Sequence, residues 1–262
     1  IFGILPKSRA DQYDMREIIK RIVDDSLFEE YKKDYGKTIL TGYARIDGWA
    51  VGIVANQRKL VKSKKGEMQF GGVIYSDSAD KATRFIANCN QKKIPLVFLQ
   101  DVTGFMVGSK SEHGGIIKDG AKMVNAVSNC VVPKFTIIIG NSYGAGNYAM
   151  CGKAYDPRLI TAWPSAELAV MSGNSAAKVL LQIEAASLKK QGQKITPKLE
   201  KELYEKIKSK YDEQVSPYYA ASRLWTDAII DPLDTRNWIS MGIEAANHAP
   251  IKKKFNLGVI QV

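Results

Sequence analysis

Two short apolar segments, residues 95–100 and 134–140, constrain the fold of this chain most, because each leads into a glycine-rich loop. Their length and apolar continuity predict buried β-strands. After the first loop, apolar residues recur at helical spacing over 114–127. This succession of strand, loop and helix predicts an α/β fold with parallel strands and right-handed crossovers. In such folds ligands bind at the carboxyl ends of the strands, where both loops are expected.

The remaining segments extend this pattern and end in a helical region. A third strand is predicted over 50–55, and a helix over 78–91 that places several apolar residues on one face. The charged segment 174–215 predicts one long helix, and further helices are predicted over 218–230 and 234–246. With 262 residues, 45% of them hydrophobic, and no glycine-, serine- or proline-rich linker, the chain is expected to form a single domain.

Composition excludes several classes of protein. No stretch of eighteen apolar residues is present, and the apolar start at 1–5 is cut short by Pro6 and Lys7, so neither a membrane span nor a signal peptide is expected. Three cysteines without CxxC spacing argue against a disulfide framework or a zinc ribbon and favour a reducing compartment. Because the chain has only two histidines, we expect no metal site.

The formal net charge of +11 would raise the local concentration of an anionic partner. Basic residues lie in scattered clusters at 58–65, 189–210 and 252–254. None of these clusters resembles a nucleic-acid-binding motif, and therefore no nucleic-acid partner is expected. A phosphorylated small molecule or an acidic protein surface fits the charge, and so does an ordinary solvated surface.

The second glycine-rich loop allows two chemical interpretations. In the first, residues 140–144 match the pattern G-x-S-x-G between a strand and a helix, which would make Ser142 the nucleophile of a serine hydrolase. This mechanism also needs an oxyanion sequence, an acid and a base, for which the candidates are His113-Gly114-Gly115, Asp231 or Asp234, and His248. Against it, the segment at His113 opens a helix well after its strand, and His248 lies at a helix end.

In the second interpretation the backbone carries the chemistry. Small residues between the strand and the helix let a ligand approach the main chain, and the first N–H groups of a helix have no internal partner. Such groups stabilise a developing oxyanion, and one preorganised donor is worth roughly 2.7–4 kcal/mol. Glycines required only for close packing of the helix on the strand remain the alternative explanation of this loop.

Six segments of the chain together carry a specific resemblance to a known family. They are YDMREII (13–19), QDVTGFMVG (100–108), GIIKDGAKMV (115–124), SYGAGNYAMCG (142–152), WPSAELAVM (163–171) and RLWTDAIIDPLDTR (223–236). Through these motifs, nearly the whole chain resembles the carboxyltransferase (beta) subunit of biotin-dependent acyl-CoA carboxylases, most closely the methylcrotonyl-CoA carboxylase beta type.

The resemblance implies a crotonase-like fold, a spiral of β-β-α units with a helical C-terminal region. The family's carboxyltransferase has two homologous halves, and residues 1–262 resemble only the C-terminal half, expected as a single crotonase-like domain without its N-terminal half. In the family each active site lies between the N-terminal half of one protomer and the C-terminal half of another. The implied partners are that N-terminal half, within a homo-oligomer, and a biotin carboxylase and biotin carrier subunit.

The resemblance also implies the residues of the site. Backbone N–H groups of Ala145 and Gly146 would stabilise the ureido oxyanion of biotin. The expected biotin site further includes Gly144, which allows close approach, together with Asn147 on the same loop and Thr103, Gly104 and Phe105 on the opposite one. No metal is implied at this site.

The implied reaction transfers a carboxyl group from carboxybiotin, carried by a partner domain, to an acyl-CoA of the methylcrotonyl or propionyl type. Residues 144–148 depart from the Gly-Gly-Ala-Tyr-Asp-like sequence of the propionyl type, which favours a branched or unsaturated acyl-CoA. A carboxyltransferase of the glutaconyl-CoA decarboxylase type remains an alternative. The expected compartment is the bacterial cytoplasm or, as second choice, the mitochondrial matrix.

Overall fold

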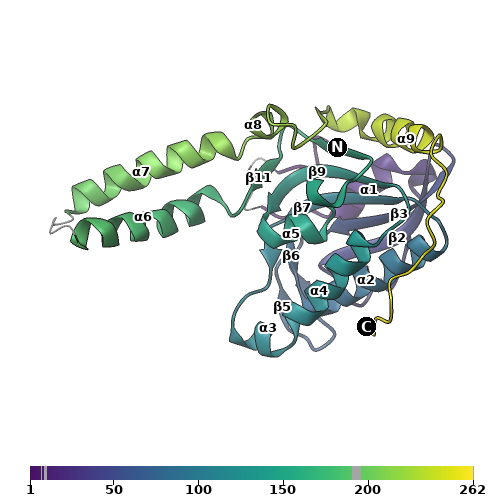
Figure 1. The fold of residues 1–262 in the computed structure, drawn as a ribbon, viewed down its shortest axis with the longest axis horizontal. Coiled ribbons are helices and arrows are strands. Elements are labelled where there is room, and N and C mark those ends of the chain that lie inside the picture. The colour runs from purple at the N-terminus through teal and green to yellow at the C-terminus, as the bar shows by residue number, and fades with distance from the viewer. Residues whose placement is uncertain (7, 9–10, 191–195, 262) are drawn as a thin grey trace.

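One mixed β-sheet organises the fold of the chain (Figure 1). The computed structural model describes residues 1–262 except 7, 9–10, 191–195 and 262, and in that part of the chain the sheet has eight strands. Seven follow the order β1-β2-β3-β7-β9-β10-β12, and β11 also pairs with β9. The strands are β1 (Glu29–Glu30), β2 (Ile39–Ile46), β3 (Trp49–Asn56), β7 (Leu96–Val102), β9 (Lys134–Tyr143), β10 (Leu159–Ala162), β11 (Glu167–Ala169) and β12 (Ala228–Ile229).

The sheet is parallel from β3 to β12 and antiparallel from β1 to β3. The predicted α/β fold with parallel strands is therefore confirmed, with an antiparallel edge added. Two small sheets adjoin it. One pairs β4 (Val61–Lys62) with β5 (Met68–Gln69), and the other pairs β6 (Val73–Ile74) with β8 (Gly104–Phe105) in parallel.

Helices cover both faces of the sheet, as Figure 1 shows. On one face lie α1 (Met15–Ile22) and α9 (Thr235–Ala246), and on the other α2 (Ser76–Gln91) and α4 (Ile116–Ser128). Alternate strand residues face the two layers: Val97 and Leu99 pack with α1 and α9, whereas Leu96 and Phe98 pack with α2 and α4. The helices predicted over 78–91, 114–127 and 234–246 are confirmed, with starts within two residues of those expected.

The prediction of one helix over 174–215 was wrong. Two helices, α6 (Gly173–Lys190) and α7 (Pro197–Gln214), pack side by side as a hairpin that extends away from the sheet (Figure 1). The second helix has its own start signal, because the Thr196 hydroxyl accepts the N–H of Leu199 and Pro197 opens the first turn.

The prediction of a helix over 218–230 was also wrong. Its first turns form α8 (Pro217–Ala221), but Leu224 has a φ of +60°, a left-handed conformation that no α-helix continues through. The chain then enters β12, which pairs in parallel with β10.

At the carboxyl end of β9 the strand runs to Tyr143, three residues beyond its predicted end, and leads directly into α5 (Gly144–Ala149). The register against β7 shifts there, since Gln100 pairs with Ile138 but Val102 pairs with Ser142. This bulge leaves three residues of β9 opposite one residue of β7. Bulges of this kind redirect side chains at the end of a strand. The remaining short helices are α3 (Ser109–His113) and the 3₁₀ turns η1 (Asp24–Ser26), η2 (Lys153–Tyr155) and η3 (Pro232–Asp234).

Candidate functional site

Main-chain donors are available where β9 turns into α5. Gly144 has a φ of +50°, which glycine adopts at little cost, and a Cβ added there would lie 2.9 Å from the carbonyl oxygen of Val170. The N-cap residue Tyr143 provides no side-chain hydrogen bond to the helix. The N–H groups of the first turn, which include those of Ala145 and Gly146, have no acceptor within the helix. The loop therefore has the form that the backbone interpretation requires.

The loop at β8 lies directly against this turn. A Cβ added to Gly146 would lie 2.6 Å from Cγ2 of Val102 and 3.2 Å from Cα of Gly104. The two loops named from the sequence thus meet through their backbones. The side chains of Thr103 and Phe105, on either side of Gly104, make their contacts away from α5. The Thr103 hydroxyl donates to the carbonyl of Gly72 at 3.1 Å, and the ring of Phe105 packs on Gly120 of α4.

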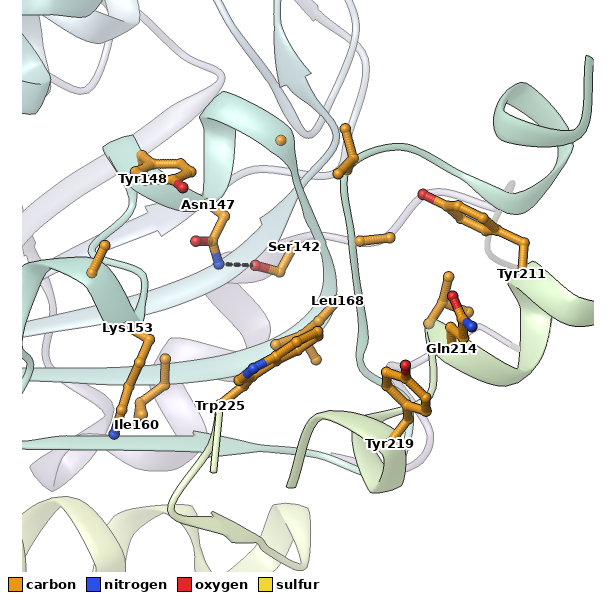
Figure 2. Close-up of a pocket in the computed structure, with 15 residues that line it drawn as sticks. Ser142, Asn147, Tyr148, Lys153, Ile160, Leu168, Tyr211, Gln214, Tyr219 and Trp225 are labelled. Carbon is orange, nitrogen blue, oxygen red and sulfur yellow. Dashed lines mark hydrogen bonds between the residues drawn. The ribbon is translucent and has the colours of Figure 1, made fainter. Parts of the chain in front are cut away.

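Ser142 lies buried beneath the turn, with 1% of its surface exposed. Its Oγ donates to Oε1 of Gln100 at 2.7 Å and accepts from Nδ2 of Asn147 at 2.6 Å (Figure 2). A nucleophile elbow instead needs an accessible Oγ bonded to a general base. This geometry opposes the serine hydrolase interpretation.

The histidines do not complete a triad with Ser142. Helix α9 packs Gly242 on Phe135, near the start of β9, and Phe135 lies about 23 Å from Ser142 at the rise of a strand. His248 is exposed and lies six residues beyond Gly242, about 9 Å at the helical rise, so it does not reach Ser142. His113 is exposed at the end of α3.

Asp101 forms a buried ionic cluster that sequence analysis did not single out. Its Oδ1 accepts the N–H of Asn141 at 2.9 Å, and its Oδ2 accepts the hydroxyl of Tyr13 at 2.9 Å and lies 3.2 Å from Nε of Arg58. Burial, reinforced by the Asp101 charge, raises the pKa of Tyr13 well above its usual value, so the phenol remains a donor. The available signal was a polar pair, Gln100 and Asp101, at the end of an apolar strand.

A pocket of about 420 Å³ opens beside the turn (Figure 2). It lies between α5, β11 and the base of the hairpin of α6 and α7. Asn147 and Tyr148 line it from α5, although the Asn147 amide is directed at Ser142. The opposite walls are aliphatic and aromatic, formed by Leu168, Val170, Tyr211, Tyr219 and Trp225.

Other reactive groups are sparse in the described part of the chain. Burial raises the pKa of Cys89 to about 12 and that of Cys130 and Cys151 to about 11, which makes these thiols poor nucleophiles. Among the described residues, no group of three or more histidine, cysteine, aspartate or glutamate side chains is placed to hold a metal ion. No helix in that part of the chain is both long and apolar enough to cross a membrane.

Comparison with known proteins gives one consistent match. The family model described as the carboxyl transferase domain matches residues 1–257. The chain is 49% identical to the mitochondrial methylcrotonoyl-CoA carboxylase beta chain of Arabidopsis thaliana, over 95% of this chain and 40% of that protein. It is 45% identical to the biotin-dependent 3-methylcrotonyl-coenzyme A carboxylase beta1 subunit of Mycobacterium tuberculosis, over 96% of this chain and 45% of that protein.

A solved structure agrees with these relatives. The beta subunit of geranyl-CoA carboxylase from P. aeruginosa superposes with a TM-score of 0.81 at 39% identity, covering 98% of this chain and 46% of the other. The chain thus spans less than half the length of each of these relatives.

Proposed function

This chain belongs to the carboxyl transferase domain family, and we propose that it contributes to the transfer of a carboxyl group from carboxybiotin to an acyl-CoA. The family and the crotonase-like fold expected from the sequence motifs are both confirmed. One observation of the site carries the proposal for its chemistry: the first turn of α5 presents main-chain N–H groups beside the backbone of β8.

These N–H groups match the charge that the reaction develops. When bound, carboxybiotin supplies an activated carboxyl group, and negative charge grows on its ureido oxygen as that group is transferred. Ala145 and Gly146 donate hydrogen bonds from fixed backbone positions, which stabilises such charge without reorganisation. Gly144 keeps the approach clear, since it has no Cβ, while Gly104 forms the opposite wall. Neither a nucleophilic side chain nor a metal ion takes part in these steps.

The pocket beside α5 fits a fused-ring ligand. Its walls offer apolar surface next to the first turn of α5, residues 144–146, which we call the donor turn. These walls are formed by Leu168, Val170, Tyr219 and Trp225. Small-molecule sites combine such surface with a few directed polar groups. We assign the bicyclic ring of biotin to this pocket, and its polar groups to the main chain at Ala145.

The acyl-CoA that we propose is branched and unsaturated, with methylcrotonyl-CoA as first choice. The relatives described above carry the names of methylcrotonyl- and geranyl-CoA carboxylases, and both acyl groups have these two features. The sequence of residues 144–148 led to the same expectation. The two relatives from curated proteins are named carboxylases, which favours carboxylation over the decarboxylase alternative.

The site needs a second half to be complete. Tyr148 of α5 and Val170, whose carbonyl oxygen lies against Gly144, are 50% and 72% exposed, and such apolar surface beside a site favours a covering partner. We propose that the chain is the C-terminal half of a carboxyltransferase and that the N-terminal half of another protomer covers it in a homo-oligomer. A biotin carrier and biotin carboxylase are the further partners, in the bacterial cytoplasm or the mitochondrial matrix.

Ala145→Pro in the assembled enzyme tests the role of the donor turn. Proline deletes one N–H group, and proline is tolerated in the first turn of a helix. We expect kcat for carboxylation of methylcrotonyl-CoA to fall by about 10²–10³, the usual cost of one oxyanion donor. Ala145→Ser, which keeps the N–H group, is the matched control. A folded Ala145→Pro enzyme with the turnover of the control would exclude this N–H group as a stabilising donor.

A further inference from the structure

A buried chain of hydrogen bonds joins α5 to the central strand β7. Asn147 Nδ2 donates to Ser142 Oγ at 2.6 Å, Ser142 Oγ donates to Gln100 Oε1 at 2.7 Å, and Gln100 Nε2 donates to the carbonyl of Met150 at 2.7 Å. We call these residues the α5 relay. Gln100 and Ser142 are 0% and 1% exposed, so water does not compete for the two bonds that Gln100 makes, and the bond from Asn147 is partly buried.

The polarity of the α5 relay is fixed from one end. The carbonyl of Met150 only accepts, and therefore Gln100 must turn its NH₂ group toward Met150 and its oxygen toward Ser142. The Ser142 hydroxyl must then donate to Gln100, which leaves its oxygen to accept from Asn147. Each link thus dictates the orientation of the next, and Asn147 takes part only as a donor.

The relay begins and ends on the same short helix. Asn147 lies directly after Gly146 in α5, and Met150 is the C-cap of that helix. The other end of Asn147 is also fixed, because its Oδ1 occupies the space next to Gly152, where an added Cβ would approach to 2.0 Å. Two attachments to β7 and β9 on one six-residue helix set its rotation about its axis. They consequently set the direction of the N–H groups in the first turn of the same helix.

We infer that Gln100, Ser142 and Asn147 are positioning residues that orient the N–H groups of Ala145 and Gly146. They act through the backbone of α5, and the Asn147 amide, although Asn147 lines the pocket, is directed at Ser142 and not into the pocket. This inference rests on the proposed function of the donor turn, and it gives Ser142 a role that requires no nucleophilic chemistry.

Asn147→Asp tests the polarity, because it changes one donor into an acceptor with almost no change in shape. An ionised carboxylate in place of the amide would set an oxygen against Ser142 Oγ, whose hydrogen already points to Gln100. We expect kcat of the assembled enzyme with methylcrotonyl-CoA to fall about tenfold or more at pH 8, since small misplacements of reacting groups cost up to about 10²-fold. The KM for methylcrotonyl-CoA should stay within about twofold, because binding is not altered.

Acid should partly restore this variant, which a merely structural defect would not predict. A protonated carboxyl donates from its O–H group and can replace the Asn147 amide, and a partly buried site raises the pKa of such a carboxyl. The ratio of variant to wild-type kcat should therefore rise about threefold or more between pH 8 and pH 6. A ratio that does not change with pH, or a kcat within twofold of wild type at pH 8, would overturn the inference.

The matched control is Asn125→Asp on α4. Asn125 is also half-buried, but its Oδ1 accepts from Asn129 Nδ2 at 2.9 Å, so an aspartate keeps its bond. This control should retain wild-type kcat at both pH values. If the Asn147→Asp enzyme does not fold, Asn147→Ala decides: a fivefold or larger loss of kcat with unchanged KM and Tm supports the relay, and wild-type kcat refutes it. If the assembled wild-type enzyme does not carboxylate methylcrotonyl-CoA, the proposed function itself is refuted, and not the relay.

Discussion

Gly146→Ala is the smallest change that tests whether the two loops of the site must stay in contact. It keeps the N–H group of residue 146 and adds one methyl group. That methyl group would lie 2.6 Å from Cγ2 of Val102 and 3.2 Å from Cα of Gly104. Val102 is fully buried on β7, so it has little freedom to withdraw.

The expected loss follows from the displacement that this overlap requires. Ordinary contact begins at 3.4 Å, and the Cβ and the Val102 methyl must therefore separate by 0.8 Å. A misplacement of about 1 Å costs up to about 10²-fold in rate, so we expect kcat to fall roughly 30- to 100-fold. Overpacking of a buried contact costs about 1–3 kcal/mol of stability, which should lower Tm modestly.

Val102→Ala provides the rescue. It removes the methyl group that the Gly146→Ala side chain meets, while the contacts with Gly104 at 3.2 and 3.3 Å remain. Val102→Ala alone should cost about 1–3 kcal/mol, since each deleted methyl group costs about 0.5–1.5 kcal/mol. We expect the double variant to recover most of the kcat lost by Gly146→Ala, measured as incorporation of labelled bicarbonate into methylcrotonyl-CoA by the assembled enzyme. A double variant as slow as Gly146→Ala would refute the reasoning, as would a Gly146→Ala enzyme with wild-type kcat.

Two further changes test buried polar side chains, one at the site and one on α2. Ser142→Ala should lower kcat about three- to tenfold, because it removes the middle of the α5 relay, whereas loss of a true nucleophile costs far more; stoichiometric labelling of Ser142 by a fluorophosphonate would contradict this assignment. Lys81→Met should raise Tm at pH 7, because Lys81 Nζ is buried without a hydrogen-bond partner among the described residues and burial lowers its pKa from 10.5 to about 8. Since this folded-state pKa lies below the unfolded one, the charged side chain destabilises the fold by roughly 3 kcal/mol below pH 8, and the penalty disappears as pH rises toward 10.5. The Tm advantage of the variant should therefore shrink between pH 7 and pH 10, and an unchanged or lower Tm at pH 7 would exclude this explanation.

The layers of the fold followed from local sequence patterns. Val97 and Leu99 face one core and Leu96 and Phe98 the other, so a strand with helices on both faces is apolar along its whole length. Continuous apolar runs therefore marked the central parallel strands, and helical periodicity marked the helices over them. Elements that depend on distant partners were missed, as for the two-residue β12, which exists only through its pairing with β10.

The hairpin of α6 and α7 shows a different limit. Apolar residues spaced by four continue through 199–211, and this periodicity alone does not reveal where a helix turns back. Thr196 followed by Pro197 was a readable start signal, but it lay within a lysine-rich segment that also suits a continuous solvated helix.

The position of the donor turn was predicted from sequence, but the contacts that orient its N–H groups could not be predicted from the residues of the turn. A six-residue helix has too few internal bonds to hold its own orientation, so its direction must come from its neighbours. Two adjacent residues of β7 fix the orientation of α5 from opposite faces of the sheet. Gln100 hydrogen-bonds to Ser142 and to the carbonyl of Met150, and Asp101 accepts the N–H of Asn141. The bulge in β9 makes both contacts available at once, because it interrupts the regular pairing of Asn141 with β7 and leaves the Asn141 N–H to Asp101. A bulge depends on the register between two segments that are distant in the sequence. For this reason a motif such as SYGAGN predicts main-chain donors but not the direction in which their N–H groups point.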